Sequence, residues 1–81
     1  MRSKGEILEW VRGVLRREFQ FRDEELLPTT RLAEDLDLDS IDAIDIAVRM
    51  EEELGVELLE SDLKSLRTLE DVVEFVHGRS A

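Results

Sequence analysis

Apolar residues recur every three or four positions in three segments of the chain, a spacing typical of amphipathic helices. These segments cover residues 3–19, 39–54 and 68–77, and a short helical turn is expected at residues 61–65. The pattern therefore predicts an all-α fold, a small four-helix bundle of three main helices and one short helix. The chain length fits a single domain over residues 1–81.

The ends of the expected helices carry residue types that commonly mark helix termini. In a capping box, two residues three positions apart each accept a hydrogen bond from the other's backbone N–H. Three pairs have this spacing: Ser3 with Glu6, Asp39 with Asp42, and Thr68 with Asp71. Gly55 is expected to end the second main helix and Gly78 the last one, because glycine readily adopts the left-handed conformation that follows a helix.

Residues 20–38 form a long first loop, in which Pro28 and the Thr29-Thr30 pair break the helical pattern. Connections of this length are uncommon in small domains and are often functional. The leucines of this region are expected to anchor the loop to the core. They are Leu26, Leu27, Leu32, Leu36 and Leu38. A second apolar segment, residues 56–59, is ambiguous between a short strand and an irregular connection.

The second main helix carries two apolar stripes when successive residues are placed about 100° apart. One is an ordinary core stripe, formed by Ala43, Ile46, Ala47, Met50 and Leu54. The other lies on the opposite side and is formed by Ile41, Ile44 and Val48. Either the helix is enclosed on both sides, or the second stripe meets a partner. The flanking carboxylates favour a partner with an apolar centre and a basic rim.

Acidic residues are concentrated in the C-terminal part of the chain. The net charge of the whole chain is −10. Residues 1–33 hold seven bases and six acids, whereas residues 34–81 hold four bases and 15 acids. The excess is densest in residues 34–53, with nine acids and one base, Arg49. A charged face can simply be solvated, but this one adjoins the second apolar stripe and favours basic partner proteins.

Composition excludes several classes of function. The chain has no cysteine and a single histidine, His77, which leaves no disulfide framework and no multi-histidine metal site. The acidity disfavours nucleic acid and anionic membrane surfaces, and no apolar run approaches the roughly 20 residues of a membrane span. The first ten residues lack the apolar stretch of a signal peptide. We expect a monomeric, cytoplasmic protein that neither inserts into membranes nor binds nucleic acid.

Ser40 lies where the long connection meets the second main helix, and two interpretations of it are open. A serine at a helix start is most often an N-cap. Alternatively, its hydroxyl carries a covalently attached group, because a phosphate ester there would meet outward-pointing N–H groups. Catalysis by Ser40 is not expected, since its only possible histidine base, His77, lies near the far terminus of the sequence.

The residues Asp35, Asp37 and Asp39 have the spacing of the first three ligands in a calcium-binding EF-hand loop. That loop also requires glycine at its sixth position and glutamate at its twelfth, where this chain has Ser40 and Ile46. No dedicated metal site is expected, although loose divalent-ion binding, and with it a divalent-ion sensor, stays an alternative.

The run EDLDLDSID at residues 34–42, followed by an acidic helix, resembles the acyl carrier proteins. The segments EEEL at residues 51–54 and TLEDVV at residues 68–73 are also similar to that family. The resemblance spans nearly the whole chain, in the order and spacing of the helices as well as in the motif. It implies a four-helix bundle with a long first loop, in agreement with the apolar pattern.

The resemblance implies that a phosphopantetheinyl transferase moves 4′-phosphopantetheine from coenzyme A to Ser40. The thiol of this arm would hold acyl groups as thioesters, and the chain would shuttle them between enzymes of fatty-acid, polyketide or related lipid biosynthesis without being an enzyme itself. In members of the family, basic patches on acyl-loading, condensing or acyl-transferring enzymes bind the second helix. By position, the contacts are Asp39, Ile41, Asp42, Ile44, Asp45, Val48, Glu51 and Glu52.

In fatty-acid-type members of the family the bundle interior can receive the acyl chain, and Ile46, Met50 and Leu66 are candidates to line that space. The chain also departs from the family pattern. Asp37 stands where the family often has glycine, and Arg49 places a positive charge in the acidic helix. A specialised carrier is therefore as consistent with the sequence as a housekeeping one. The alternative function is an unmodified acidic module that binds a basic partner through the helix after Ser40.

Overall fold

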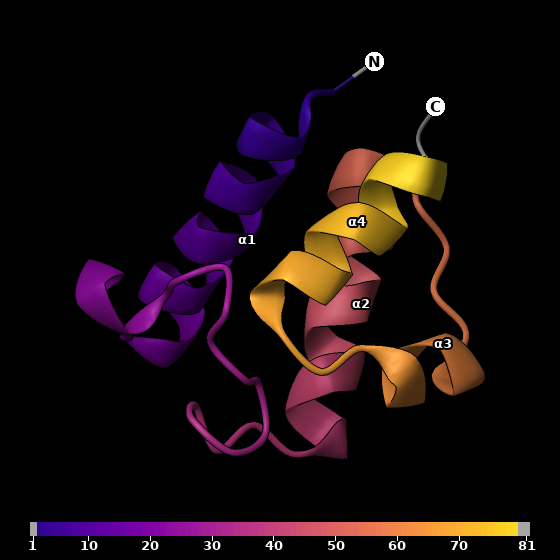
Figure 1. The fold of residues 1–81 in the computed structure, drawn as a ribbon. Helices are drawn as coiled ribbons and strands as arrows, with labels where there is room; N and C mark the ends of the chain where they lie inside the picture. Colours follow the sequence, from indigo (N-terminus) through magenta and orange to yellow (C-terminus); the bar gives the residue numbers. More distant parts are fainter. Residues whose placement is uncertain (1, 80–81) are drawn as a thin grey trace.

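The computed structural model describes residues 2–79 and arranges them as helices joined by loops (Figure 1). The elements are α1 (Lys4–Phe19), the 3₁₀ helix η1 (Asp23–Glu25), α2 (Ser40–Leu54), α3 (Glu60–Ser65) and α4 (Leu69–Arg79). Across these residues no strand is formed, and residues 56–59 are irregular. The all-α prediction, with three main helices, one short helix and a long first loop, is confirmed.

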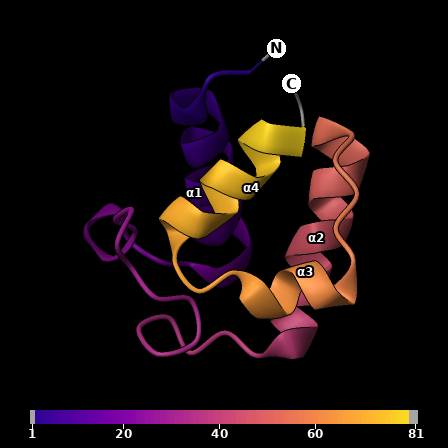
Figure 2. The same cartoon turned by 45° about the vertical axis from the view of Figure 1, so that its right-hand side comes forward.

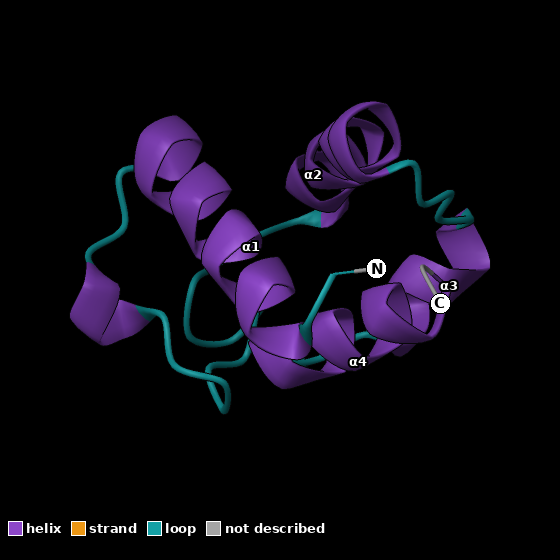
Figure 3. Ribbon diagram, turned by 90° about the horizontal axis from the view of Figure 1, so that it is seen from above, coloured by secondary structure: helices purple, strands orange, loops and turns teal. Residues whose placement is uncertain are grey.

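The direction of the chain brings the main helices together around one interior. In Figure 1 the chain descends through α1, crosses below the bundle in the long connection and rises through α2. α4 packs against α1, and α3 lies beside α2 (Figure 2). Seen from above, α1, α2 and α4 surround the same interior (Figure 3). No helix in the described part of the chain is both long and apolar enough to cross a membrane.

The core is built from one face of each main helix, as the apolar spacing predicts. The buried apolar side chains of these helices are Ile7, Val11, Val14, Leu15, Ala47, Met50, Leu54, Leu69, Val72, Val73 and Val76. Ala43 and Ile46 of the predicted core stripe of α2 are half-buried rather than fully buried. They lie near the start of α2, where the interior is less completely filled.

The three predicted capping boxes are confirmed. Reciprocal hydrogen bonds between side chain and backbone join Ser3 with Glu6, Asp39 with Asp42, and Thr68 with Asp71. Gly55 ends α2 as expected, with a left-handed φ of 70°. These local hydrogen bonds satisfy N–H groups that the first turn of a helix cannot pair internally.

The prediction that Gly78 ends the last helix is wrong, because α4 continues to Arg79. The guanidinium of Arg79 lies 4.6 Å from the centroid of the Phe75 ring, one turn earlier in the helix. It also lies 4.0 Å from the carboxylate of Asp62. These contacts compensate for the loss of helix propensity at glycine, which is roughly 1 kcal/mol.

Part of the predicted leucine set anchors the long connection to the core. Leu26 and Leu36 are buried, and Leu32 and Leu38 pack against the core with partial exposure. Leu27 is 53% exposed, so its predicted role as an anchor is wrong. Leu26 and Leu27 are neighbours in the sequence, and only one of the two side chains reaches the interior.

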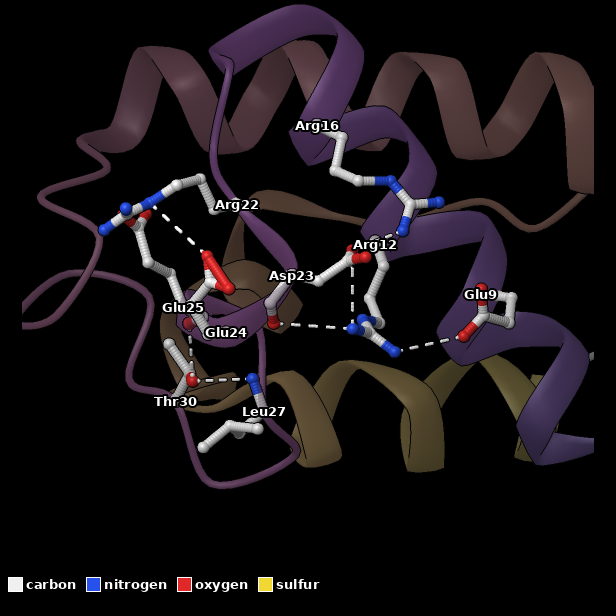
Figure 4. Close-up of polar contacts among 9 residues, drawn as sticks. All are labelled: Glu9, Arg12, Arg16, Arg22, Asp23, Glu24, Glu25, Leu27 and Thr30. Carbon is white, nitrogen blue, oxygen red and sulfur yellow. Dashed lines mark hydrogen bonds and ion pairs between the residues drawn. The ribbon is translucent and has the colours of Figure 1, made fainter.

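The turn that follows Leu27 is fixed by a buried hydroxyl. Thr30 Oγ1 accepts a hydrogen bond from the N–H of Leu27 and donates one to the carbonyl of Glu25, both at 2.9 Å (Figure 4). Thr30 is 7% exposed, and these two hydrogen bonds satisfy its buried hydroxyl. The backbone of this turn therefore directs Leu27 outward.

Ion pairs with α1 hold η1 in place (Figure 4). The carboxylate of Asp23 faces the guanidinium groups of Arg12 and Arg16, and Arg12 also pairs with Glu9 at 3.1 Å. The hydrogen bond from Arg16 is the main cause that lowers the pKa of Asp23 below its usual value. The long connection thus starts from a fixed position on α1.

Backbone hydrogen bonds hold the other end of the connection. The N–H of Leu32 donates to the carbonyl of Arg67 at 2.9 Å, and the carbonyl of Leu32 accepts from the N–H of Leu38 at 3.1 Å. The N–H of Leu69 donates to the carbonyl of Thr30 at 3.1 Å. The residues just before α2 are therefore tied to the segment that leads into α4, despite the length of the connection.

Asp37 has a φ of 55°, in the left-handed region that glycine adopts without steric cost. Glycine at this position would adopt the same conformation without strain. We predict that Asp37→Gly is more stable than Asp37→Ala by about 1 kcal/mol. Both variants lose the same charge, so the comparison isolates the backbone. Urea unfolding measures the difference, and equal stabilities would contradict it.

The carboxylate of Asp71 accepts hydrogen bonds from the backbone N–H groups of Arg67 at 3.0 Å and Thr68 at 3.1 Å. These bonds hold the pKa of Asp71 below its ordinary value of 3.8. The stabilisation that the Asp71 carboxylate provides is therefore complete at a pH above the pKa of this group in the unfolded chain. It is lost as the pH falls through the lower pKa that the group has in the folded chain.

We predict that Asp71→Asn lowers the free energy of unfolding at neutral pH by up to about 1 kcal/mol. The difference between wild type and variant should shrink as the pH falls below 3.8, the ordinary pKa of this carboxyl group. Chemical unfolding at a series of pH values measures it. A difference that stays constant into strong acid would show that the carboxylate charge plays no part.

Candidate functional site

Ser40 is the first residue of α2, and its side chain is exposed. The preceding residue makes the cap: Asp39 Oδ1 accepts from the N–H of Asp42 at 2.9 Å, and Asp42 Oδ2 accepts from the N–H of Asp39 at 3.3 Å. The interpretation of Ser40 as the N-cap is therefore wrong. Within residues 2–79 the Ser40 hydroxyl makes no hydrogen bond, so its oxygen stays at the surface without a structural role.

One arginine neutralises part of the acidic run that precedes Ser40. Arg31 Nη1 lies 3.0 Å from Glu34 Oε2, and Arg31 Nη2 lies 3.1 Å from Asp35 Oδ1. The hydrogen bonds from the Arg31 side chain, followed by the one from its backbone N–H, lower the pKa of Asp35. Together with the N–H groups at the start of α2, Arg31 moderates the negative charge that an anionic group on Ser40 would meet.

The second apolar stripe of α2 is exposed to solvent. Ile41 is 74% exposed, Ile44 is 48% exposed and Val48 is 47% exposed. Toward the core, Ala47 and Met50 of the same helix are buried. The helix is therefore not enclosed on both sides, and the apolar stripe is open to contact with a partner.

The acidic residues that flank this stripe are not equivalent. Arg49 Nη2 lies 2.6 Å from Glu18 Oε1 of α1, and Arg49 Nε lies 3.6 Å from Asp45 Oδ2. Glu51 and Glu52 are exposed and form no ion pair within the residues that the structure describes. The pattern missed the Glu18 contact, because the two residues belong to different helices. The i,i+4 spacing of Asp45 and Arg49 was the only local signal.

Glu53, the last acid of the EEEL segment, contacts a neighbouring helix. Its Oε1 accepts a hydrogen bond from Trp10 Nε1 at 3.2 Å, which links α2 to α1. The position of Glu53 in a run of three acids gives no sign of this contact. Of that run, Glu51 and Glu52 therefore remain as candidates for partner binding.

A cavity of about 370 Å³ opens beside Ser40, between α2, α3 and the end of the long connection. Ile46, Met50 and Leu66, the three residues expected to line an interior space, all line this cavity. Its volume lies within the range of roughly 300–1,000 Å³ found for small-molecule sites. Because Ser40 borders the same cavity, a flexible group on its hydroxyl can reach apolar surroundings.

The three aspartates with EF-hand spacing do not form a metal site. Among the described residues, no group of three or more acidic or histidine side chains is placed to hold a metal ion. Asp35 is bound to Arg31, and Asp39 caps α2. The structure thus offers no support for a divalent-ion sensor built on this loop.

Residues 9–76 match the protein family described as the phosphopantetheine attachment site. The chain is 40% identical to acyl carrier protein 2 of Ralstonia nicotianae over 76 residues, which cover 94% of each chain. It is 33% identical to the acyl carrier protein of Thermosynechococcus vestitus over 79 residues, 98% of each chain. The meromycolate extension acyl carrier protein of Mycobacterium leprae is 37% identical over 71 residues, 88% of this chain and 56% of that protein.

The chain therefore belongs to the acyl carrier proteins. It is a carrier with a covalently attached 4′-phosphopantetheine, and it works with biosynthetic enzymes in fatty-acid or related biosynthesis. The residues present fit such a group, because a free surface hydroxyl adjoins an apolar cavity at the start of α2. When bound, the arm supplies a thiol that this cysteine-free chain lacks.

Proposed function

We propose that Ser40 is the residue that carries the 4′-phosphopantetheine arm. In this reaction Ser40 Oγ forms a bond to the 4′-phosphate phosphorus of coenzyme A, 3′,5′-ADP leaves, and a base of the phosphopantetheinyl transferase takes the serine proton. The observation that carries the proposal is the exposed Ser40 hydroxyl, which no hydrogen bond within residues 2–79 occupies, at the edge of the cavity. Because Asp39 caps α2, modification of Ser40 removes no interaction that the helix needs.

The outer surface of α2, which we call the docking face, is proposed to bind the partner enzymes. It consists of Asp39, Ile41, Asp42, Ile44, Asp45, Val48, Glu51 and Glu52. Its exposed apolar stripe suits the centre of an interface, and its carboxylates suit a basic rim on the partner. The proposed partners are the phosphopantetheinyl transferase and enzymes that load, condense or transfer the acyl group.

The chain itself is proposed to have no catalytic activity and to act as a cytoplasmic monomer. The one histidine, His77, belongs to the C-terminal part of α4, at the opposite end of the bundle from the start of α2 (Figure 1). A histidine at that end cannot serve Ser40 as a general base, since a base must lie within hydrogen-bond reach of the proton that it takes.

The cavity beside Ser40 is proposed to hold part of the acyl chain during transport. Its lining of Ile46, Met50 and Leu66 offers apolar contacts, which shield an alkyl chain from water. An acyl group that is long enough to enter this space should therefore stabilise the fold.

Loading of the carrier tests the attachment residue. We predict that incubation with coenzyme A and a promiscuous phosphopantetheinyl transferase adds the mass of one phosphopantetheinyl group to the wild type and none to Ser40→Ala. Ser65→Ala is the matched control and should load fully, because the Ser65 hydroxyl lies at the end of α3 and donates to the carbonyl of Asp62. Intact-mass spectrometry reads the result, and a full mass gain on Ser40→Ala would refute the proposal.

The alternative of an unmodified acidic module uses the same docking face without the arm. It requires that Ser40→Ala leaves the biological role intact while Asp45→Lys abolishes it. Membership of a family defined by phosphopantetheine attachment supports the modified carrier instead.

Filling the cavity tests its proposed role. We predict that octanoylation of the arm raises the melting temperature of the wild type by several degrees, since 1 kcal/mol of buried apolar contact shifts Tm by about 4–8 °C in so small a domain. In Ala43→Leu, where the added side chain enters the cavity, the rise should be much smaller. Val48→Leu, which adds a methylene on the docking face, should keep the full rise. Equal rises in all three proteins would contradict the proposal.

A further inference from the structure

A positively charged residue of α2 lies beside the docking face, which is otherwise flanked by carboxylates. Arg49 is the only base in α2, and its guanidinium lies between carboxylates of two helices. Arg49 Nη2 is 2.6 Å from Glu18 Oε1, and Arg49 Nε is 3.6 Å from Asp45 Oδ2. Arg49 Nε is also shielded from solvent. The guanidinium is therefore held beside Glu18 and Asp45, while the Arg49 side chain as a whole remains 36% exposed.

Because of Arg49, the carboxylates of the docking face differ in whether a positive group lies beside them. Asp45, near the middle of α2, has a positive group beside its carboxylate, whereas Glu51 and Glu52 have none within the described chain. A partner that approaches the middle of α2 meets a charge pair, and one that approaches its C-terminal end meets two uncompensated carboxylates. The negative potential is consequently uneven along the helix.

We propose that Arg49 is a selectivity residue, which masks Asp45 and so favours partner enzymes with no cation opposite the middle of α2. This inference rests on the proposed docking function of α2. An enzyme with a lysine or arginine at that place meets the guanidinium of Arg49, and the like charges repel each other. An enzyme whose basic side chains reach only the two ends of the helix meets no such repulsion.

Glu18 stabilises this arrangement through its cross-helix ion pair with Arg49. In the described chain it forms an ion pair with Arg49 and with no residue of the docking face, and its side chain is 36% exposed. Its carboxylate holds the guanidinium toward α1, from where Arg49 Nε faces Asp45. Loss of Glu18 leaves the positive charge of Arg49 in α2, so it should not unmask Asp45.

A double-mutant cycle measures the masking directly. The proteins are wild type, Asp45→Asn, Arg49→Gln and the double variant, and the readout is kcat/KM for loading by a phosphopantetheinyl transferase with a basic docking patch. We expect Arg49→Gln to raise kcat/KM by about two- to fivefold, the range for one exposed charge pair. Asp45→Asn should lower kcat/KM less in the wild type, where Arg49 lies beside the carboxylate, than in the Arg49→Gln background, where it should cancel the gain. The gain should shrink as salt is added.

Two further variants separate masking from a merely structural role. Glu18→Gln removes the same cross-helix ion pair as Arg49→Gln and should lower the melting temperature to a similar extent, but it should not raise kcat/KM. Arg49→Lys keeps the positive charge and should load like the wild type. The inference is overturned if Asp45→Asn has the same effect in both backgrounds, or if Glu18→Gln raises kcat/KM as much as Arg49→Gln. A wild type that is not loaded at all would instead refute the proposed function.

Discussion

The reciprocal hydrogen bonds between Asp39 and Asp42 are the interaction on which the site depends. They satisfy N–H groups in the first turn of α2, which would otherwise need another acceptor. Because Asp39 takes this role, the next residue, Ser40, begins the helix with a hydroxyl that the fold does not use. The backbone hydrogen bonds of Leu32 with Arg67 and Leu38 then fix the segment before the cap. A long connection thus places one exposed hydroxyl at a defined position.

α2 contributes to two surfaces, the core and the outer face of the molecule, and this explains why it carries two apolar stripes. Its inner side closes the core through Ala47 and Met50, while Ile44 and Val48 remain about half exposed on its outer side. A helix with one buried side gains nothing in its own stability from apolar residues on the other, so the outer stripe supports the proposed contact with other proteins. The cavity beside Ser40 borders the same helix, whose incompletely filled end adjoins the proposed attachment point.

The apolar spacing and the cap residues were enough to predict the helices, their order and most of their ends, because these features depend on neighbours within one turn. The exceptions depend on other contacts. Gly78 stays helical because Arg79 stacks on Phe75, and Leu27 points outward because a turn fixed by Thr30 directs it there. For the site, the exposed stripe was predictable from periodicity, and the cavity lining was expected from the resemblance to the acyl carrier proteins. The pairing of Arg49 with Glu18 was not, since a tertiary ion pair leaves no trace in sequence spacing.

The central claim is that the outer face of α2, with Ser40 at its start, is the surface that partner enzymes bind. Backbone amide NMR of the ¹⁵N-labelled carrier, titrated with a phosphopantetheinyl transferase, tests it most directly. The account predicts that shift changes and line broadening concentrate at Ile41, Ile44, Val48, Glu51 and Glu52, and that the amides of α1 stay unaffected. Changes that concentrate on α1 and η1, with α2 unperturbed, would contradict the account.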